Sequence, residues 1–251
     1  MNNIFLENAK CFATTHALPI ATEINKAITY IIYGAHCNAF LLLQLKERCF
    51  CRYIVLNTEN YKSICFKNKY YRTLLQTSQV LDYTPQNRLY LKHNMDINIM
   101  GFHWFQSLPN TIESLERSID FCFVGAESEK RLSVEKLMKE TYPQKNIMFV
   151  YPTEPVDLTM TFLQSKVVVN IPFYDDNWEM HRVHKALSCG CRVLSHLPKD
   201  ESIVSLYEDY VYFTEDYISS LNIPKKKYED LVKHYNENVD KHVKWLLKMQ
   251  S

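Results

Sequence analysis

Residues 166–199 constrain the fold of this chain more than any other stretch, because they contain a strand, a helix and a second strand in succession. The β-branched run at residues 167–171 is typical of a strand that is buried on both faces. Apolar residues at helical spacing then predict a helix over residues 178–188, and Gly190 suits the left-handed conformation that ends many helices. Residues 192–195 are the next short strand. A strand, helix and strand of these lengths predict a parallel sheet, because two consecutive parallel strands need a crossover connection.

The loop and the helix between these two strands carry many polar side chains. We expect them at the carboxyl end of the first strand, which is where open α/β sheets bind their ligands. Helix N-terminal N–H groups and arginines bind phosphate oxygens, and a carboxylate accepts hydrogen bonds from sugar hydroxyls. The alternative is a solvated helix start, capped by Asp176 or Asn177, in which Glu179 and Arg182 form an ordinary exposed ion pair. The polar side chains are Asp175, Asp176, Asn177, Glu179, His181, Arg182, His184 and Lys185.

The rest of the chain alternates short apolar runs with helical patterns, which predicts parallel sheets with helices on both faces. The alternation lapses and then restarts, so we expect a domain boundary near residues 103–119. The expected domains are residues 1–110 and 111–222, followed by a C-terminal segment, 223–251, whose amphipathic helix packs back on the protein. The expected strands are residues 28–33, 52–57, 79–82, 97–100, 120–124, 146–150, 167–171, 192–195 and 210–213. The other expected helices are residues 38–48, 70–76, 85–93, 127–140 and 155–164, with a short one from Asp200.

Glycine is scarce, with four in the chain, and a scarce glycine tends to stand where only glycine fits. Gly34, Gly101 and Gly125 each follow an expected strand, where a turn brings the backbone close to a ligand. The alternative is that they serve only tight turns, which is the commonest use of glycine.

The composition is that of a globular protein, with 47% hydrophobic and 23% charged residues and a net charge of +1. Such a small net charge gives no general attraction for nucleic acid or acidic lipid. The eight cysteines include no CxxC pair, so we expect reduced thiols and a cytoplasmic location. No apolar run has the length of a membrane span, and the first ten residues do not read as a signal peptide.

Residues 179–195, EMHRVHKALSCGCRVLS, resemble the donor-binding segment of GT-B glycosyltransferases of the "glycosyl transferases group 1" type. The family pattern has an acidic residue, an arginine three positions later, an alanine, a small residue and a glycine, followed by a Val-apolar-Ser strand. Three further similarities precede it in the family's order. They are YIVLNTE at 53–59, VLDYTPQN at 80–87, and FCFVG at 121–125 followed by Arg131.

The resemblance implies a GT-B fold, in which two Rossmann-like domains with parallel sheets face each other across a cleft. It implies a glycosyltransferase that moves a sugar from a nucleotide-sugar donor to an acceptor, which stays unidentified. It implies neither a cofactor nor a metal, because such enzymes stabilise the leaving diphosphate with helix dipoles and cationic side chains. The residues that it assigns to the donor are Gly125, Arg131, Asn177, Glu179, His181, Arg182 and Lys185.

The sequence departs from the family pattern at Asn177 and Lys185, where retaining members often carry two glutamates eight positions apart. The glutamate that binds the ribose hydroxyls is therefore missing. We expect Glu179 to take this role and Arg182 to bind the diphosphate, so that Glu179→Gln and Arg182→Ala fold normally but lose donor binding or transfer. Whether transfer inverts or retains configuration stays open.

Arg131 has the alternative of a solvated surface charge, on a helix whose expected core positions are Leu132, Val134, Leu137 and Met138. An inverting transferase also needs a base for the acceptor proton. The candidate bases follow expected strands of the first domain, and they are Glu59, Asp82 and His36. The alternatives are that Asp82 caps the helix that begins at Pro85 and that His36 packs in a turn.

Two other functions stay open. A degenerate transferase would bind nucleotide sugars without turnover, which Lys185 favours. A transferase that glycosylates modified DNA bases would need a basic groove and an extruded base, and the near-zero net charge argues against it.

Overall fold

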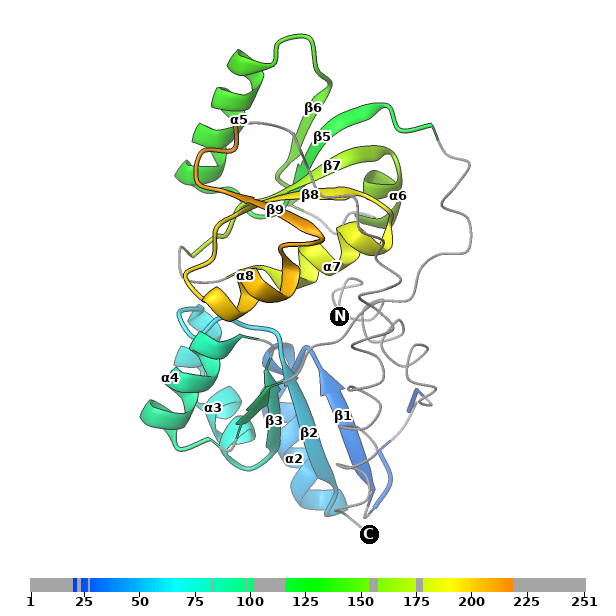
Figure 1. The fold of residues 1–251 in the computed structure, drawn as a ribbon. Helices are drawn as coiled ribbons and strands as arrows, with labels where there is room; N and C mark the ends of the chain where they lie inside the picture. Colours follow the sequence, from blue (N-terminus) through cyan, green and yellow to red (C-terminus); the bar gives the residue numbers. More distant parts are fainter. Residues whose placement is uncertain are drawn as a thin grey trace. The chain divides into compact units, whose positions relative to one another are not determined.

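The computed structural model of the chain describes residues 20–21, 24–26, 28–82, 84–97, 99–101, 116–153, 158–174 and 178–218. Within these ranges the chain is an α/β protein with two separate parallel sheets, and it divides into two compact units (Figure 1). Unit 1 holds the described residues up to 101, and unit 2 holds those from 116 to 218. Most of the expected domain boundary and the whole of the expected C-terminal helix lie outside the described residues.

The sheet of unit 1 has its strands in sequence order, β1-β2-β3-β4, and every pair of neighbours is parallel. The strands are β1 (Thr29–Tyr33), β2 (Arg52–Asn57), β3 (Gln79–Asp82) and β4 (Ile99–Gly101). The connections contain η1 (Ala35–Cys37), α2 (Ala39–Cys49), η2 (Ile64–Lys67), α3 (Lys69–Gln76) and α4 (Pro85–Met95).

The described helices of unit 1 pack on one face of its sheet. Every connection moves to the next strand in the same direction, so right-handed crossovers bring all of them to the same side. The core joins Tyr53 and Val55 of β2 to Leu74 of α3 and Leu91 of α4. Ile54, Leu56 and Leu81, which lie outside that core cluster, are buried as well. The first strand was expected to be buried, but β1 is half-buried because it is an edge strand of the described sheet.

The sheet of unit 2 has the order β6-β5-β7-β8-β9 and is parallel throughout. The chain moves outward from β5 to β6 and then returns past β5 to β7, so the strand order reverses between β5 and β7. Right-handed crossovers therefore place α5 on one face and α6, α7 and α8 on the other. The strands are β5 (Ile119–Val124), β6 (Ile147–Val150), β7 (Ser165–Asn170), β8 (Arg192–His196) and β9 (Val211–Thr214). The helices are α5 (Glu129–Thr141), α6 (Leu158–Leu163), α7 (Met180–Ser188) and α8 (Glu201–Tyr207).

Helix α5 presents a different face to the core from the one expected. Leu132 and Leu137 are 41% and 39% exposed, whereas Arg131, Val134 and Met138 are buried. Positions 131, 134 and 138 lie on one side of the helix at i, i+3 and i+7. A charged residue therefore occupies a core-facing position, and the interpretation of Arg131 as a solvated surface charge is wrong.

Helix α7 begins at Met180, two residues later than predicted, and its N-cap position is Glu179. The predicted capping residues Asp176 and Asn177 lie outside the described residues. The apolar face was predicted correctly, because Met180, Val183, His184 and Leu187 are all buried.

The C-terminal end of α7 is closed by a glycine, as predicted. Gly190 has φ 69°, in the left-handed region, and its N–H donates to Leu187 O at 2.9 Å. The N–H of Cys191 donates to Ala186 O at 3.0 Å. These two bonds satisfy carbonyls that the helix itself leaves unpaired, and they turn the chain directly into β8.

No helix in the described ranges is both long enough and apolar enough to cross a membrane. The seven cysteines in these ranges form no disulfide, and Cys11 lies outside them.

Substitutions of Gly190 test how much the end of α7 contributes to the stability of the protein. Gly190→Ala should lower the free energy of unfolding by about 1 to 2 kcal/mol, because a Cβ is strained at positive φ. Gly190→Asn should cost less, since asparagine tolerates the left-handed region. Chemical denaturation of the three proteins measures the difference, and equal stability of the alanine variant and the wild type would contradict this account.

Candidate functional site

The candidate site lies at the carboxyl edge of the unit 2 sheet, where the strand order reverses between β5 and β7. In open α/β sheets this is the position at which the connections leave toward opposite faces and open a crevice for a ligand. Gly125 follows β5 directly, and Ile171 follows β7. Arg131 of α5, Glu179 before α7 and Arg182 of α7 extend to this edge and form one connected group, which we call the Arg–Glu–Arg cluster.

Arg131 is the most buried member of the cluster, with a side chain that is 2% exposed. Its Nε and Nη2 donate to Ile171 O at 3.1 and 2.7 Å, and its Nη1 donates to Ala126 O at 2.7 Å. Nη2 also lies 2.5 Å from Glu179 Oε1. The guanidinium thus ties together the residues that follow β5 and β7. Burial lowers the pKa of Arg131, an effect that the charge of Glu179 opposes.

Arg182 is fixed by a second set of acceptors. Its Nε donates to Val124 O at 3.1 Å, its Nη1 donates to Asn170 Oδ1 at 2.9 Å, and the same Nη1 lies 2.5 Å from Glu179 Oε2. None of the described residues accepts a hydrogen bond from Nη2, and the side chain is 11% exposed. Arg182 therefore carries two N–H donors that an added anion can use.

Glu179 has both carboxylate oxygens engaged. Oε1 accepts from Arg131 Nη2 and, at 2.8 Å, from the N–H of Phe173, while Oε2 faces Arg182. The side chain consequently makes no capping bond to α7. The predicted ion pair with Arg182 exists, but it is largely enclosed and shared with Arg131. Glu179 is thus engaged in holding the two arginines, and the prediction that it binds sugar hydroxyls gains no support.

The two guanidiniums stack on the ring of Phe123, and Gly125 leaves space for them because it has no side chain. The carbon centres of Arg131 and Arg182 lie 4.9 and 4.7 Å from the centre of the Phe123 ring. A Cβ at Gly125 would stand 2.7 Å from Arg182 Nη2 and 3.0 Å from Phe123 Cζ. Glycine therefore leaves room at this position for the guanidinium of Arg182. The role of Gly125 toward a ligand stays a prediction.

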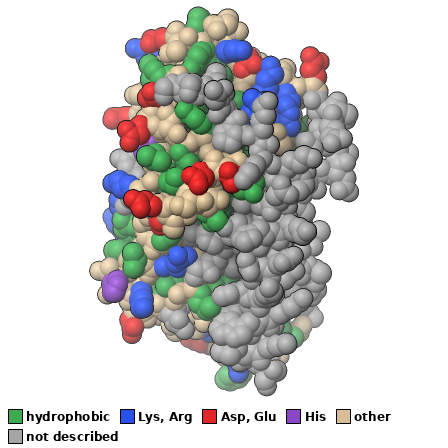
Figure 2. All heavy atoms as spheres, in the orientation of Figure 1, with side chains coloured by type: hydrophobic (Ala, Val, Ile, Leu, Met, Phe, Trp, Pro, Cys, Tyr) green, Lys and Arg blue, Asp and Glu red, His purple; other side chains and the backbone are tan. Residues whose placement is uncertain are grey.

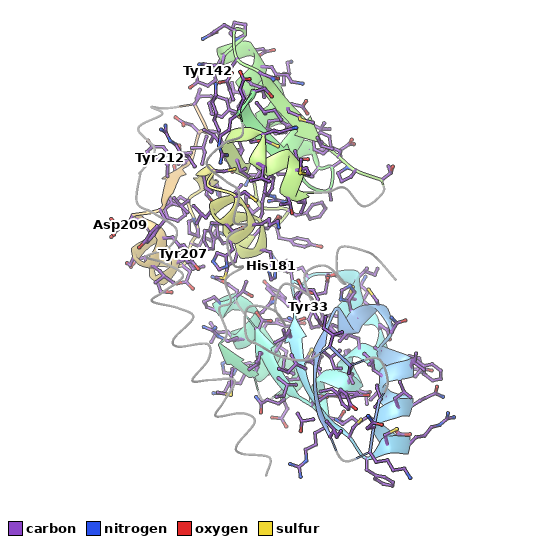
Figure 3. All side chains as sticks on the ribbon, turned by 90° about the vertical axis from the view of Figure 1, so that its right-hand side faces the viewer. Tyr33, Tyr142, His181, Tyr207, Asp209 and Tyr212 are labelled. Carbon is purple, nitrogen blue, oxygen red and sulfur yellow. The ribbon has the colours of Figure 1, made fainter. Side chains whose placement is uncertain are left out.

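The remaining predicted donor residues flank the cluster on α7 or lie outside the described residues. His181 projects from α7 on the side away from the sheet (Figure 3). Burial lowers the pKa of His181 to about 4, so its imidazole is neutral at pH 7 and supplies no positive charge. Lys185 follows on the next turn and forms no ion pair with a described residue. Asn177 is not among the described residues.

In unit 1, Asp82 is buried in a network of uncharged donors at the carboxyl ends of β2 and β3. Its Oδ1 accepts from the N–H and the hydroxyl of Thr84 at 2.7 and 3.0 Å. Its Oδ2 accepts from Asn57 Nδ2 at 2.5 Å and Asn87 Nδ2 at 2.9 Å. The N-cap position of α4 is Thr84 and no side chain caps it, so the interpretation of Asp82 as a helix cap is wrong. With four donors on its oxygens, Asp82 is suited to holding the edge of the sheet together.

The other two candidate bases lie together. His36 Nε2 is 3.4 Å from Glu59 Oε1, and their side chains are 12% and 22% exposed. The alternative for His36 was a histidine that only packs in a turn. Its ring does pack edge-on against Tyr71, with 6.1 Å between the ring centres, in addition to its contact with Glu59. The pairing gives both residues a shared polar site in unit 1.

Two residues of the site were not assigned to it from the sequence. Asn170 Oδ1 accepts a hydrogen bond from Arg182 Nη1. Asn170 Nδ2 donates to Ser195 Oγ at 3.0 Å, and Trp178 Nε1 donates to the same oxygen at 2.9 Å. Phe123 provides the ring beneath both guanidiniums. Two signals point to Asn170 in the sequence: it is a polar residue at the end of an otherwise apolar strand, and residues 169–171 resemble the family's strand, which often ends in asparagine.

From the cluster we expect that replacing Glu179 lowers the free energy of unfolding much more than replacing an exposed glutamate does. Glu179→Gln leaves two enclosed guanidiniums without their counter-charge. It should therefore lower the free energy of unfolding by about 3 to 5 kcal/mol, which replaces the expectation from the sequence that this variant folds normally. Glu140→Gln is the matched control, because Glu140 and Lys136 form an exposed pair, 63% and 77% exposed, 3.9 Å apart. Such a pair contributes about 0 to 1 kcal/mol. Urea denaturation compares the two, and an equal effect would contradict the structural role of Glu179.

Asp82 predicts a specific dependence of stability on pH. Burial raises its pKa from 3.8 to about 6, although the hydrogen bonds from Asn57, Thr84 and Asn87 act in the opposite direction. The folded state therefore binds more protons than the unfolded state between these values, so this group's contribution to stability falls as pH rises from about 4 to about 6. Denaturation across this window should show a slope that Asp82→Asn removes. An unchanged slope in the variant would contradict the assignment.

On the face shown in Figure 2, the described acidic and basic side chains are interspersed. This view gives no support to a basic groove for DNA.

No protein-family model matches the sequence, and no curated protein is significantly similar to it. What can be inferred about function therefore comes from the two polar edges of the sheets and the resemblance in residues 179–195.

Proposed function

We propose that the chain is a GT-B glycosyltransferase and that its unit 2 binds the diphosphate of a nucleotide-sugar donor at the Arg–Glu–Arg cluster. The observation that carries this proposal is the position of the cluster, because it lies where the strand order of a doubly wound sheet reverses. The two parallel sheets in two units agree with the coarse architecture of such enzymes.

The charges of the cluster suit a phosphate. Two guanidiniums and one carboxylate leave a formal charge of +1, and the open N–H donors belong to Arg182. Glu179 and the backbone carbonyls hold the arginines before any ligand arrives, so a bound phosphate need not order them. Preorganised donors of this kind stabilise charge that develops on a leaving diphosphate. Lys185, on the next turn of α7, adds a second cation within the same helix.

A nucleotide-sugar-binding module without turnover is the second candidate. This candidate is favoured because two of the predicted carboxylates are already occupied by protein groups and are not open to a substrate. Asp82 has four donors on its oxygens, and Glu179 is paired with two arginines. Of the predicted catalytic residues, His36 and Glu59 keep exposed area for an acceptor. Turnover of a bound nucleotide sugar distinguishes the enzyme from the module.

Binding can be tested with UDP-glucose, GDP-mannose, CMP-sialic acid and dTDP-glucose as probes. At 100 times its dissociation constant, a ligand that binds only the folded state stabilises it by about 2.7 kcal/mol, which raises the melting temperature. Lys185→Ala and Gly125→Ala should fold and should weaken binding of the active probe by about 10-fold or more, because one removes a cation and the other displaces Arg182 Nη2. Calorimetric titration measures the affinities.

Lys136→Ala is the matched control, since Lys136 is an exposed lysine on α5 that pairs with Glu140 and not with the Arg–Glu–Arg cluster. It should leave binding unchanged. Absence of stabilisation by all four probes, or undiminished binding in both site variants, would refute the donor site. Binding with no release of nucleoside phosphate in the presence of candidate acceptors would support the module over the enzyme.

A further inference from the structure

A second chemical site lies in unit 1, in the loops that follow β1 and β2. His36 stands in η1, Glu59 stands in the loop after β2, and Cys65 stands in η2. One ligand atom from each of these three residues lies within 4.8 Å of the other two, and all three residues are half-buried. Nitrogen, carboxylate oxygen and sulfur are the three ligand types that zinc uses in proteins.

Two distances between donor atoms, which involve the two different oxygens of Glu59, match those around a tetrahedral ion. Zinc–ligand bonds of about 2.0 to 2.3 Å place neighbouring ligand atoms about 3.3 to 3.8 Å apart. His36 Nε2 is 3.4 Å from Glu59 Oε1, and Cys65 Sγ is 3.7 Å from Glu59 Oε2. Cys37 adds a second thiol beside the histidine, with Sγ 3.3 Å from Nε2.

The ligands are held by the residues around them. The carbonyl of Glu59 accepts from Asn57 Nδ2 at 2.9 Å and from Asn87 Nδ2 at 2.8 Å, which fixes the backbone of the loop. The hydroxyl of Ser63 donates to Glu59 Oε2 at 3.0 Å and orients the carboxylate. Partners of this kind around the ligands are characteristic of protein metal sites.

We propose that His36, Glu59 and Cys65 bind a zinc-type divalent cation, which fastens the loop after β1 to the segment between β2 and α3. This inference does not use the donor site of unit 2, but it competes with a catalytic role for His36 and Glu59 in unit 1. It also assigns His36 and Glu59 as metal ligands, in place of the catalytic bases expected from the sequence. An ordinary histidine–glutamate ion pair with a neighbouring thiol is the alternative that the experiment must separate.

The test uses the full chain, treated with EDTA and then titrated with zinc chloride. We expect about one tightly bound zinc per chain, measured by mass spectrometry of metal content, and a higher melting temperature in the zinc form. Cobalt in place of zinc should give the thiolate-to-metal absorption band that requires a cysteine ligand. His36→Gln and Cys65→Ser should each abolish stoichiometric binding. Cys49→Ser is the matched control, because Cys49 is also half-buried in unit 1 but contacts Ile24 O, and it should bind zinc as the wild type does.

A measurement on the wild type covers the case in which a ligand variant does not fold. Zinc should slow alkylation of Cys65, read out by peptide mapping, and should leave the rate at Cys49 unchanged. No stoichiometric zinc in the wild type, equal binding in both ligand variants, or equal alkylation rates at Cys65 with and without zinc would overturn the proposal.

Discussion

Unit 2 depends on how it satisfies a guanidinium that is almost entirely removed from water. The N–H groups of Arg131 need acceptors, and these come from the backbone after β5, the backbone after β7 and the carboxylate of Glu179. Two stretches that are distant in sequence, residues 126–131 and 171–179, are thereby joined through one charged side chain. Because an unpaired buried charge is costly, the loss of any one acceptor would destabilise the position of Arg131 and with it the contacts to the remaining acceptors. The same constraint fixes Glu179, and through it the position of Arg182.

Unit 1 meets a comparable problem with the opposite charge and without an ion pair. Asp82 is buried at the ends of its strands, and amides and a threonine supply the hydrogen bonds. Uncharged donors compensate a carboxylate less completely than an arginine does, which agrees with the raised pKa of Asp82. The carboxyl edges of the two sheets therefore differ in character, one collecting cations and the other collecting carboxylates and a histidine.

Local patterns in the sequence predicted most of the strands and helices, because β-branched runs and helical spacing report on burial directly. The end of α7 at Gly190 followed from the special backbone freedom of glycine. Local patterns failed on α5, where Leu132 was placed inside and Arg131 outside. Which of two neighbours is buried there depends on an acceptor 48 positions away, Glu179, and no local pattern contains that information. The face on which the described helices of unit 1 pack also follows from strand order and not from any local pattern.

The sequence predicted which residues form the candidate site, but it did not predict which of them contact each other. Gly125, Arg131, Glu179 and Arg182 do come together, yet the carboxylate binds the arginines and not an open position. Likewise His36 and Glu59 were both predicted at the carboxyl ends of strands of the first domain, whereas their contact with each other and the nearby Cys65 were not predicted. Residue types indicate what chemistry is possible, whereas the hydrogen-bond partners decide which groups keep unused capacity.

The close approach of Gly125 to Arg182 has a consequence for the evolution of this protein. No side chain fits at position 125 while both guanidiniums lie over Phe123, and neither arginine is stable there without Glu179. The four positions 125, 131, 179 and 182 should therefore be inherited as a group. Divergent descendants should retain the glycine, the two arginines and the glutamate together, or replace them together with an apolar set. A lineage that has lost one of the four alone would have passed through an intermediate that is less stable or binds its ligand less well, so such sequences should be rare.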